Sequence, residues 1–211
     1  MTIVVGYRKE AIQYAYGSRC GELEIKYIES IVFDRTGSAY SLWLAREALL
    51  CEDRFLLEGD VFFEEDALRY LLFGEATDVA AVAPFNAFDA RVRGSIVRSQ
   101  LHLRFPHAFS AKLTADGPRP FKTLKLLRLS AMTLRAMIVP ALDDIIGSGA
   151  KQADTEELFA DLVERRGLRL ATARCDDLRW YEIDSTEDLR IAERIFARAK
   201  AFGVPNELHY R

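Results

Sequence analysis

The amino-acid sequence predicts an α/β fold, a three-layer α/β/α sandwich around a mainly parallel, mixed sheet of the Rossmann-like kind. Two observations lead to this prediction. Short, continuous apolar runs at residues 2–6, 55–57 and 78–84 are typical of strands that are buried on both faces. Helical patterns separate these runs, and strands that alternate with helices indicate a parallel sheet covered by helices on both sides.

The composition limits the class of protein. Half of the 211 residues are hydrophobic, which is enough for one substantial core, and no repeat or linker divides residues 1–211. A net charge of -3 argues against a nucleic-acid partner. The three cysteines lack metal-ligand spacing, which suggests reduced thiols, and no run reaches the roughly 20 apolar residues that span a bilayer. We therefore expect one domain located in the cytoplasm, without a membrane or nucleic-acid partner.

The first half of the chain alternates regularly between strands and helices. The expected elements are a strand over 2–6, a helix over 8–16, a strand over 24–28, a helix capped by Ser38 or Ser41, a strand over 55–57, a helix over 64–73 and a strand over 78–84. The acidic residues in the first turn of the helix over 64–73 suit the helix dipole, and Gly74 is expected to end it.

The second half begins with β-like pieces and ends with helices. Residues 91–129 are expected as an antiparallel excursion, with strands at 91–98, 101–105 and 121–129 and a turn at 116–118. The remaining expectations are a helix capped by Ser130, a helix with an Asp154–Glu157 capping box, strands over 168–173 and 180–183, and a last helix after 184–185 that ends at Gly203 and Pro205.

Two of the expected strands end in an aspartate. Asp60 follows the run Phe55–Leu57, and Asp184 follows the run Trp180–Ile183. Ligands of open α/β sheets bind outside the carboxyl ends of strands, and two carboxylates that meet there favour a cation such as Mg²⁺ between them. Taken alone, however, Asp184 is better explained as a helix cap, and Asp60 fits a turn residue equally well.

Four segments in order resemble the sugar-nucleotidyltransferase-like superfamily. They match in particular the branch that transfers CMP to phosphocholine and related phospho-alcohols, or a nucleotide to sugar phosphates. The segments are Tyr40-Ser41-Leu42-Trp43-Leu44-Ala45, Leu57-Glu58-Gly59-Asp60-Val61-Phe62-Phe63, Phe121-Lys122-Thr123-Leu124-Lys125 and Trp180-Tyr181-Glu182-Ile183-Asp184-Ser185-Thr186-Glu187-Asp188-Leu189. The third segment is similar to a Lys-Thr-Val-Asn strand and the fourth to a Trp-x-Glu-Ile-Asp-x-x-Glu-Asp-Leu motif. The resemblance runs from Ile3 to about Phe196.

The resemblance implies a Mg²⁺-dependent nucleotidyltransferase. Its substrates would be a nucleoside triphosphate, with CTP favoured, and a small phosphorylated acceptor that attacks the α-phosphorus and releases pyrophosphate. Asp60 and Asp184 match the two metal-holding aspartates, and Lys122 becomes the candidate catalytic phosphate contact. Ser41, Glu58 and Trp180 are the candidate substrate-binding residues.

Several of these residues have simpler interpretations. Ser41 fits a helix cap, and Lys122 fits a solvated strand lysine nearly as well as a phosphate ligand. Trp43 and Trp180 could face a choline-like cation, but such tryptophans more often belong to the core. Glu156 and Glu157 match an acidic pair of the family, yet the helix dipole alone explains glutamates in a first turn.

The chain departs from the family in one respect. The family begins with a strand and a loop of the type Ala-Gly-x-Gly-x-Arg whose backbone amides hold the triphosphate, and no segment of this sequence matches it. We consider three explanations: a start at an internal methionine of a longer protein, which we favour; a second polypeptide that supplies the loop; or a relative that binds without catalysis. A homodimer that covers the resulting strand edge is a further expectation.

Two other functions stay open at this point. One is a metal-dependent glycosyltransferase of the related fold, in which Glu58-Gly59-Asp60 would hold an activated sugar but Asp184 would have no role. The other is a non-catalytic nucleotide-binding domain that lost the phosphate loop.

Overall fold

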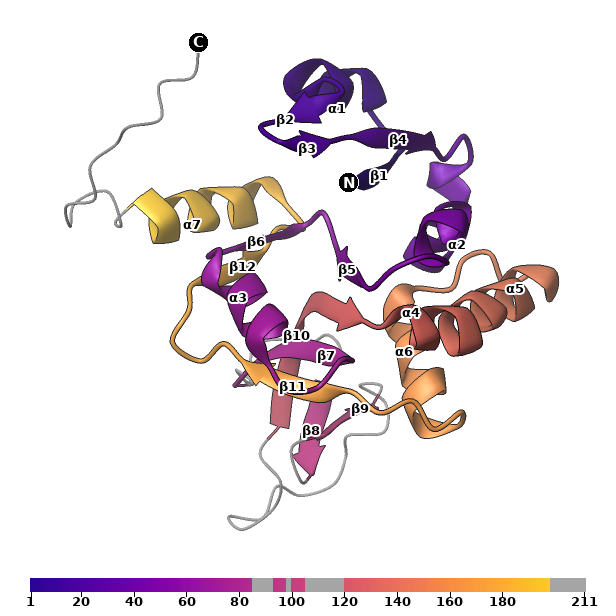
Figure 1. The fold of residues 1–211 in the computed structure, drawn as a ribbon. Helices are drawn as coiled ribbons and strands as arrows, with labels where there is room; N and C mark the ends of the chain where they lie inside the picture. The colour runs from indigo at the N-terminus through magenta and orange to yellow at the C-terminus, as the bar shows by residue number, and fades with distance from the viewer. Residues whose placement is uncertain (85–92, 98–99, 105–119, 198–211) are drawn as a thin grey trace.

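The computed structural model describes residues 1–84, 93–97, 100–104 and 120–197 (Figure 1). The first half contains β1 (Thr2–Val5), α1 (Lys9–Tyr16), β2 (Arg19–Cys20), β3 (Leu23–Glu24), β4 (Lys26–Glu29), α2 (Ser38–Leu44), β5 (Arg54–Leu57), β6 (Val61–Phe63), α3 (Asp66–Phe73) and β7 (Val79–Pro84). The second half contains β8 (Arg93–Val97), β9 (Gln100–Arg104), β10 (Pro120–Leu129), α4 (Ala131–Thr133), a π-helical segment (Leu134–Ile138), α5 (Val139–Gly147), α6 (Thr155–Glu164), β11 (Ala171–Arg174), β12 (Trp180–Glu182) and α7 (Thr186–Ala197). Short 3-10 helices lie at Phe33–Arg35 and Arg46–Leu49.

The main sheet is mixed, as the sequence predicts. Its strand order is β5-β10-β7-β11-β9-β8, in which β7 and β11 are parallel and β10 runs antiparallel to both β5 and β7. A separate parallel pair, β1–β4, lies at the N-terminal end of the chain, and β6 pairs antiparallel with β12. The segment expected as an antiparallel excursion therefore contributes β8 and β9, together with a strand, β10, between β5 and β7.

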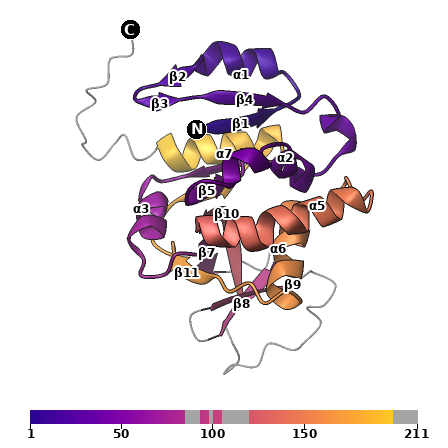
Figure 2. The same cartoon turned by 45° about the vertical axis from the view of Figure 1, so that its right-hand side comes forward.

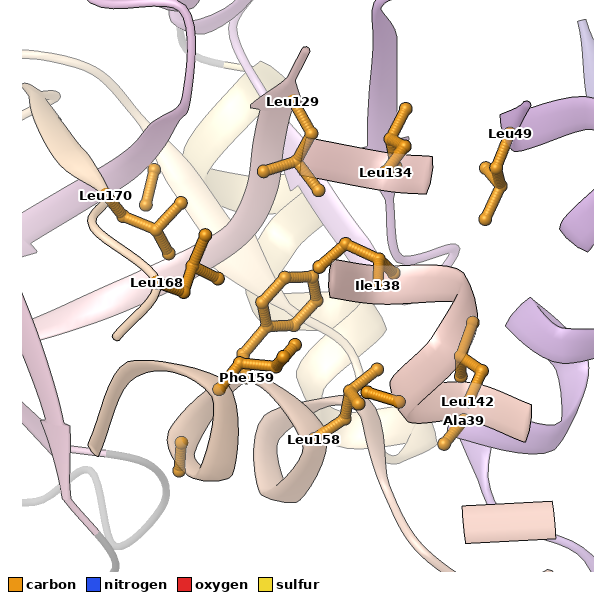
Figure 3. Close-up of a cluster of buried hydrophobic side chains, with 14 of the residues drawn as sticks. Ala39, Leu49, Leu129, Leu134, Ile138, Leu142, Leu158, Phe159, Leu168 and Leu170 are labelled. Carbon is orange, nitrogen blue, oxygen red and sulfur yellow. The ribbon is translucent and has the colours of Figure 1, made fainter. Parts of the chain in front are cut away.

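Helices cover both faces of the sheet and enclose two cores. Successive residues of β7 alternate between these cores, with Ala80 and Val82 in one and Val79, Ala81 and Ala83 in the other. The first core contains residues of α2, the π-helical segment, α5 and α6, such as Ile138 in the π-helical segment, Leu142 on α5 and Phe159 on α6 (Figure 3). The second contains residues of α3, which lies across the sheet from α5 and α6 (Figures 1 and 2). This arrangement confirms the predicted α/β/α sandwich.

Local capping signals are confirmed at two helices and wrong at one. The hydroxyl of Ser130 accepts from the backbone N–H of Thr133, and the Asp154–Glu157 capping box is present at α6. The predicted side-chain cap of α2 by Ser38 or Ser41 is wrong, because the cap residue is Gly37 and both serines lie inside the helix. The Ser38 hydroxyl faces α6 instead of its own helix.

Two further expectations concern residues outside those that the structure describes. The turn at 116–118 and the end of the last helix at Gly203 and Pro205 fall outside the described residues. Of the helices that the structure describes, none has the length and apolar character needed to cross a bilayer.

Candidate active site

The antiparallel pair β6–β12 brings the two predicted metal-binding aspartates together. Glu182 on β12 is paired with Val61 on β6, and the backbone N–H of Ile183 donates to the carbonyl of Asp60 at 2.8 Å. Asp60 and Asp184 therefore flank the same end of this two-stranded ladder. Side-chain oxygens of Asp60, Glu182 and Asp184 all lie within 4.8 Å of one another.

Asp184 is not the cap of α7, which was the alternative interpretation of this residue. Ser185 fills that role, because its hydroxyl accepts from the backbone N–H of Asp188 and donates to the Asp188 carboxylate at 2.7 Å. The backbone N–H of Asp184 also donates to this carboxylate. These hydrogen bonds lower the pKa of Asp188 and fix the turn after β12, so the carboxylate of Asp184 is not needed for capping.

The donor set fits a hard divalent cation. It consists only of carboxylate oxygens, the ligand type that Mg²⁺ prefers. Within the part of the chain that the structure describes, Oδ1 of Asp60 is buried and has no hydrogen-bond partner. A buried carboxylate oxygen without a donor is unfavourable unless a cation approaches it.

Two lysines of β10 form ion pairs with Glu182. The ammonium of Lys122 lies 2.8 Å from Oε2 of Glu182, and that of Lys125 lies 2.7 Å from Oε1. Burial disfavours the charged form of Glu182, but the hydrogen bonds from both lysines outweigh it and lower the pKa of this carboxyl. Glu182 is therefore ionised and fixes the positions of both lysine ammonium groups.

Lys125 contacts more carboxylates than Glu182 alone. Its ammonium lies 3.4 Å from Oε2 of Glu58, 3.4 Å from Oδ2 of Asp60 and 3.2 Å from Oε1 of Glu156. Burial works against its charge, but the hydrogen bond that Lys125 donates to Glu182 and the nearby negative charges raise the pKa of Lys125 well above the ordinary value. The lysine is a permanent cation in the centre of the acidic cluster.

The structural comparisons identify the fold around this site. The chain superposes on the inositol-1-phosphate CTP transferase from T. maritima with a TM-score of 0.66 at 18% identity, covering 97% of this chain and 78% of that one. The CTP:phosphocholine cytidylyltransferase from Streptococcus pneumoniae gives a TM-score of 0.65 at 17% identity, covering 93% and 78%. The chain has the fold of these two nucleotidyltransferases.

A sequence comparison adds a curated relative. The chain is 31% identical over 201 residues to the CMP-5'-(3-aminopropyl)phosphonate synthase of Streptomyces rubellomurinus. This match covers 93% of the present chain but only 31% of the relative, so the chain spans about a third of that protein. No protein-family model matches the chain.

Of the predicted substrate-binding residues, Glu58 lies within the acidic cluster around Lys125. Oε1 of Glu58 accepts from the hydroxyl of Thr155 at the start of α6, and burial raises the pKa of Glu58. Thr155 in turn meets Ser38: the backbone N–H of Thr155 donates to the Ser38 hydroxyl at 2.9 Å. Glu58 is thus fixed by contacts that link α2, α6 and the loop after β5.

The predicted catalytic residue Lys122 is buried beside Trp180. Only 7% of its side chain is exposed, and its ammonium lies 5.4 Å from the centre of the Trp180 ring. The cation beside the Trp180 ring in this structure is therefore Lys122, a residue of the chain itself. Trp180 also packs against the core on the α3 side of the sheet.

Of the other residues singled out from the sequence, Glu156 joins the cluster, whereas Ser41, Trp43 and Glu157 lie elsewhere. Ser41 is half-buried within α2, and Trp43 donates a hydrogen bond from its indole to Asp143 at 2.8 Å while Arg46 stacks over its ring. Glu156 and Glu157 have separate roles: Glu156 contacts Lys125, whereas Glu157 belongs to the capping box of α6. The predicted acidic pair therefore contributes one residue to the cluster.

Two residues of the cluster were missed by sequence reasoning. Glu182 had a readable signal, since Trp180, Glu182 and Asp184 are spaced by two and so share one face of a strand. Lys125 had none, because it is an odd number of positions from Lys122 and a regular strand would point the two lysines to opposite faces.

Proposed function

We propose that the chain is a Mg²⁺-dependent nucleotidyltransferase that transfers CMP from CTP to a small phosphorus acid. The observation behind this proposal is the meeting of Asp60 and Asp184 at one end of the β6–β12 ladder, with a buried, unpaired Oδ1 on Asp60. The three relatives described above are each named for CMP or CTP. Their named acceptors are an aminoalkyl phosphonate, inositol 1-phosphate and phosphocholine, which share one compact phosphate or phosphonate group.

The proposed reaction forms one P–O bond and breaks another. An oxygen of the acceptor's phosphate or phosphonate attacks the α-phosphorus of CTP, the bond from the α-phosphorus to the bridging oxygen breaks, and pyrophosphate leaves. The attacking oxygen is already anionic at neutral pH, so no general base is needed. The protein must instead align two anions and neutralise the charge between them.

The cluster offers groups suited to that task. Asp60 and Asp184 would hold Mg²⁺, which when bound neutralises phosphate charge and orients the triphosphate. Glu182 positions Lys122 and Lys125, and Lys122 is the proposed phosphate contact. Burial of Glu182 and the two lysines strengthens the electrostatic interactions of these groups with a bound phosphate.

The test is nucleotide transfer by the purified chain. CTP, ATP, GTP and UTP should each be offered with Mg²⁺ and an acceptor panel: phosphocholine, a sugar 1-phosphate and 3-aminopropylphosphonate. Pyrophosphate release should be fastest with CTP and should require both acceptor and metal. Failure to form any CMP–acceptor product would count against the proposal, and transfer from a sugar nucleotide without pyrophosphate release would favour the glycosyltransferase.

The non-catalytic alternative predicts a different result. CTP would then bind in a Mg²⁺-dependent manner, but no pair of substrates would react. We also retain as proposals a location in the cytoplasm and a homodimer. The dimer is motivated by β5, which pairs only with β10 among the described strands and exposes Phe55 and Leu57. Light scattering that gives a monomer mass would contradict the dimer.

A further inference from the structure

The ammonium of Lys125 occupies a position that suits a metal ion. It lies within 3.4 Å of one oxygen from each of Glu58, Asp60, Glu156 and Glu182. A single point surrounded by four carboxylate oxygens is a donor set typical of hard divalent cations, which bind such oxygens at about 2.0–2.6 Å. In this protein the ammonium group of Lys125 occupies that point.

The backbone of β10 is distorted at the residue that fills it. Thr123 pairs with Val82 and Leu127 with Ala80, so β10 uses four steps where β7 uses two. Lys125 lies in this bulge with a φ of 57°, a left-handed conformation that lysine seldom adopts. Leu124 and Leu126 on either side are fully buried and anchor the bulge. The distortion points Lys125 toward Glu58 and Glu182. Glu182 is also the carboxylate that Lys122 contacts.

The charge of the cluster explains what this lysine contributes. Four carboxylates (Glu58, Asp60, Glu156 and Glu182) contact the ammonium of Lys125, Lys122 contacts Glu182 as well, and Asp184 lies beside Asp60 and Glu182. Carboxylates this close repel one another unless cations lie between them. Lys125 contacts Glu58 and Glu156 as well as Asp60, while Asp60 turns Oδ2 toward Lys125 and keeps Oδ1 unpaired.

We propose that Lys125 is a built-in substitute for a second divalent cation, which limits the centre to one metal ion held by Asp60 and Asp184. This proposal rests on the metal centre of the proposed function. Two-metal sites place their ions about 3.5–4 Å apart and share a carboxylate between them. Here Asp60 would be the shared carboxylate, between the ammonium of Lys125 and the metal ion. Lys125 is therefore a positioning residue that sets the number and affinity of the metal ions.

Counting bound Mn²⁺ by electron paramagnetic resonance tests this proposal without any reaction. The wild-type chain should bind one Mn²⁺. Lys125→Asn removes the charge with a residue that tolerates the left-handed conformation, and it should bind two Mn²⁺, the tighter one about tenfold more strongly than wild type. Lys125→Arg keeps the charge and should bind one. Lys151→Asn, at an exposed lysine outside the cluster, is the matched control and should also bind one.

Each other outcome has a defined meaning. One Mn²⁺ of unchanged affinity in Lys125→Asn would overturn the role of Lys125 but leave the metal centre standing. Two Mn²⁺ in the wild type would overturn the proposal even if no variant folds. No Mn²⁺ in the wild type would overturn it together with the metal centre. If the wild type binds one Mn²⁺ and Lys125→Asn binds two, but no nucleotide is transferred, the result would support the role of Lys125 and contradict only the proposed enzyme activity.

Discussion

Lys122 and Lys125 contact the two oxygens of one carboxylate, that of Glu182, at 2.8 and 2.7 Å. On a regular strand residues at this spacing face opposite sides of the sheet. The bulge in β10 and the left-handed backbone at Lys125 remove that alternation and bring both ammonium groups to one side. A buried carboxylate with two lysines has consequences for stability as well as for chemistry.

Removing Lys122 should destabilise the fold strongly. The Lys122 and Glu182 side chains are each only 7% exposed, so Lys122→Met leaves a buried carboxylate with one of its two lysines. Breaking a buried ion pair costs about 3–5 kcal/mol, and we expect about 3 because Lys125 remains. Urea unfolding measures this. The exposed Lys26→Met on β4 is the control and should change the free energy of unfolding by less than about 0.5 kcal/mol. Equal effects in the two variants would contradict the prediction.

Replacing either proposed metal ligand should weaken metal binding but not folding. Asp60→Asn and Asp184→Asn keep the shape of each side chain and remove one negative charge. We expect Mn²⁺ affinity to fall at least about tenfold and nucleotide transfer about a hundredfold, because each ligand contributes directly to charge neutralisation. Calorimetric titration and pyrophosphate release measure the two effects. Glu75→Gln, at an exposed residue after α3, should behave as wild type. Normal Mn²⁺ binding by Asp60→Asn would rule out this residue as a ligand.

Gly37 should not tolerate a side chain. A Cβ there would lie 2.5 Å from the carbonyl oxygen of Gln152 and would also meet the carbonyl of Ala153, and neither backbone group can move aside easily. The close approach joins α2 to the start of α6 and so places Ser38 against Thr155. Gly37→Ala should cost about 1–3 kcal/mol, as overpacked sites do.

The control for this variant is Gly147→Ala at the end of α5. A Cβ at Gly147 meets nothing within 4 Å. The free energy of unfolding of Gly147→Ala should therefore equal that of the wild type or exceed it by up to about 1 kcal/mol. Thermal unfolding of both variants provides the comparison. Similar melting temperatures would show that the α2–α6 approach is looser than the structure describes.

The contact between Glu64 and Arg179 should make stability depend on acid pH. The backbone N–H of Arg179 donates to one carboxylate oxygen of Glu64 at 2.9 Å and its Nε to the other at 2.6 Å, and these bonds lower the pKa of Glu64. A lowered pKa means that the folded chain holds the proton less tightly than the unfolded chain. The resulting stability is complete above the ordinary glutamate pKa and is lost as the pH falls through the lowered value.

Glu64→Gln removes this dependence. Wild type should be more stable than the variant at neutral pH, and the difference should shrink steadily as the pH falls below the ordinary glutamate pKa. Urea unfolding at neutral and acid pH measures it. Glu65→Gln, at an exposed neighbour, should follow wild type throughout. A gap between Glu64→Gln and wild type that stays constant with pH would contradict the titration of Glu64.

Much of the fold could be predicted because its signals are local. The buried run of β7 is apolar on both faces, and the Asp154–Glu157 and Ser130 caps depend only on residues within one turn. The cap predicted for α2 was wrong because Ser38 has a partner more than a hundred residues away, at Thr155. A hydroxyl that bridges two helices looks the same in the sequence as one that caps its own helix.

The sequence by itself determined the alternation of strands and helices and the two aspartates at strand ends, because periodicity and strand ends are properties of short segments. Only the tertiary structure decided that Asp60 and Asp184 meet, since the register of β6 against β12 is a long-range pairing. It also decided that Lys125 enters the site. The bulge that points this lysine inward depends on how β10 packs between β5 and β7, and no periodicity of the sequence encodes it.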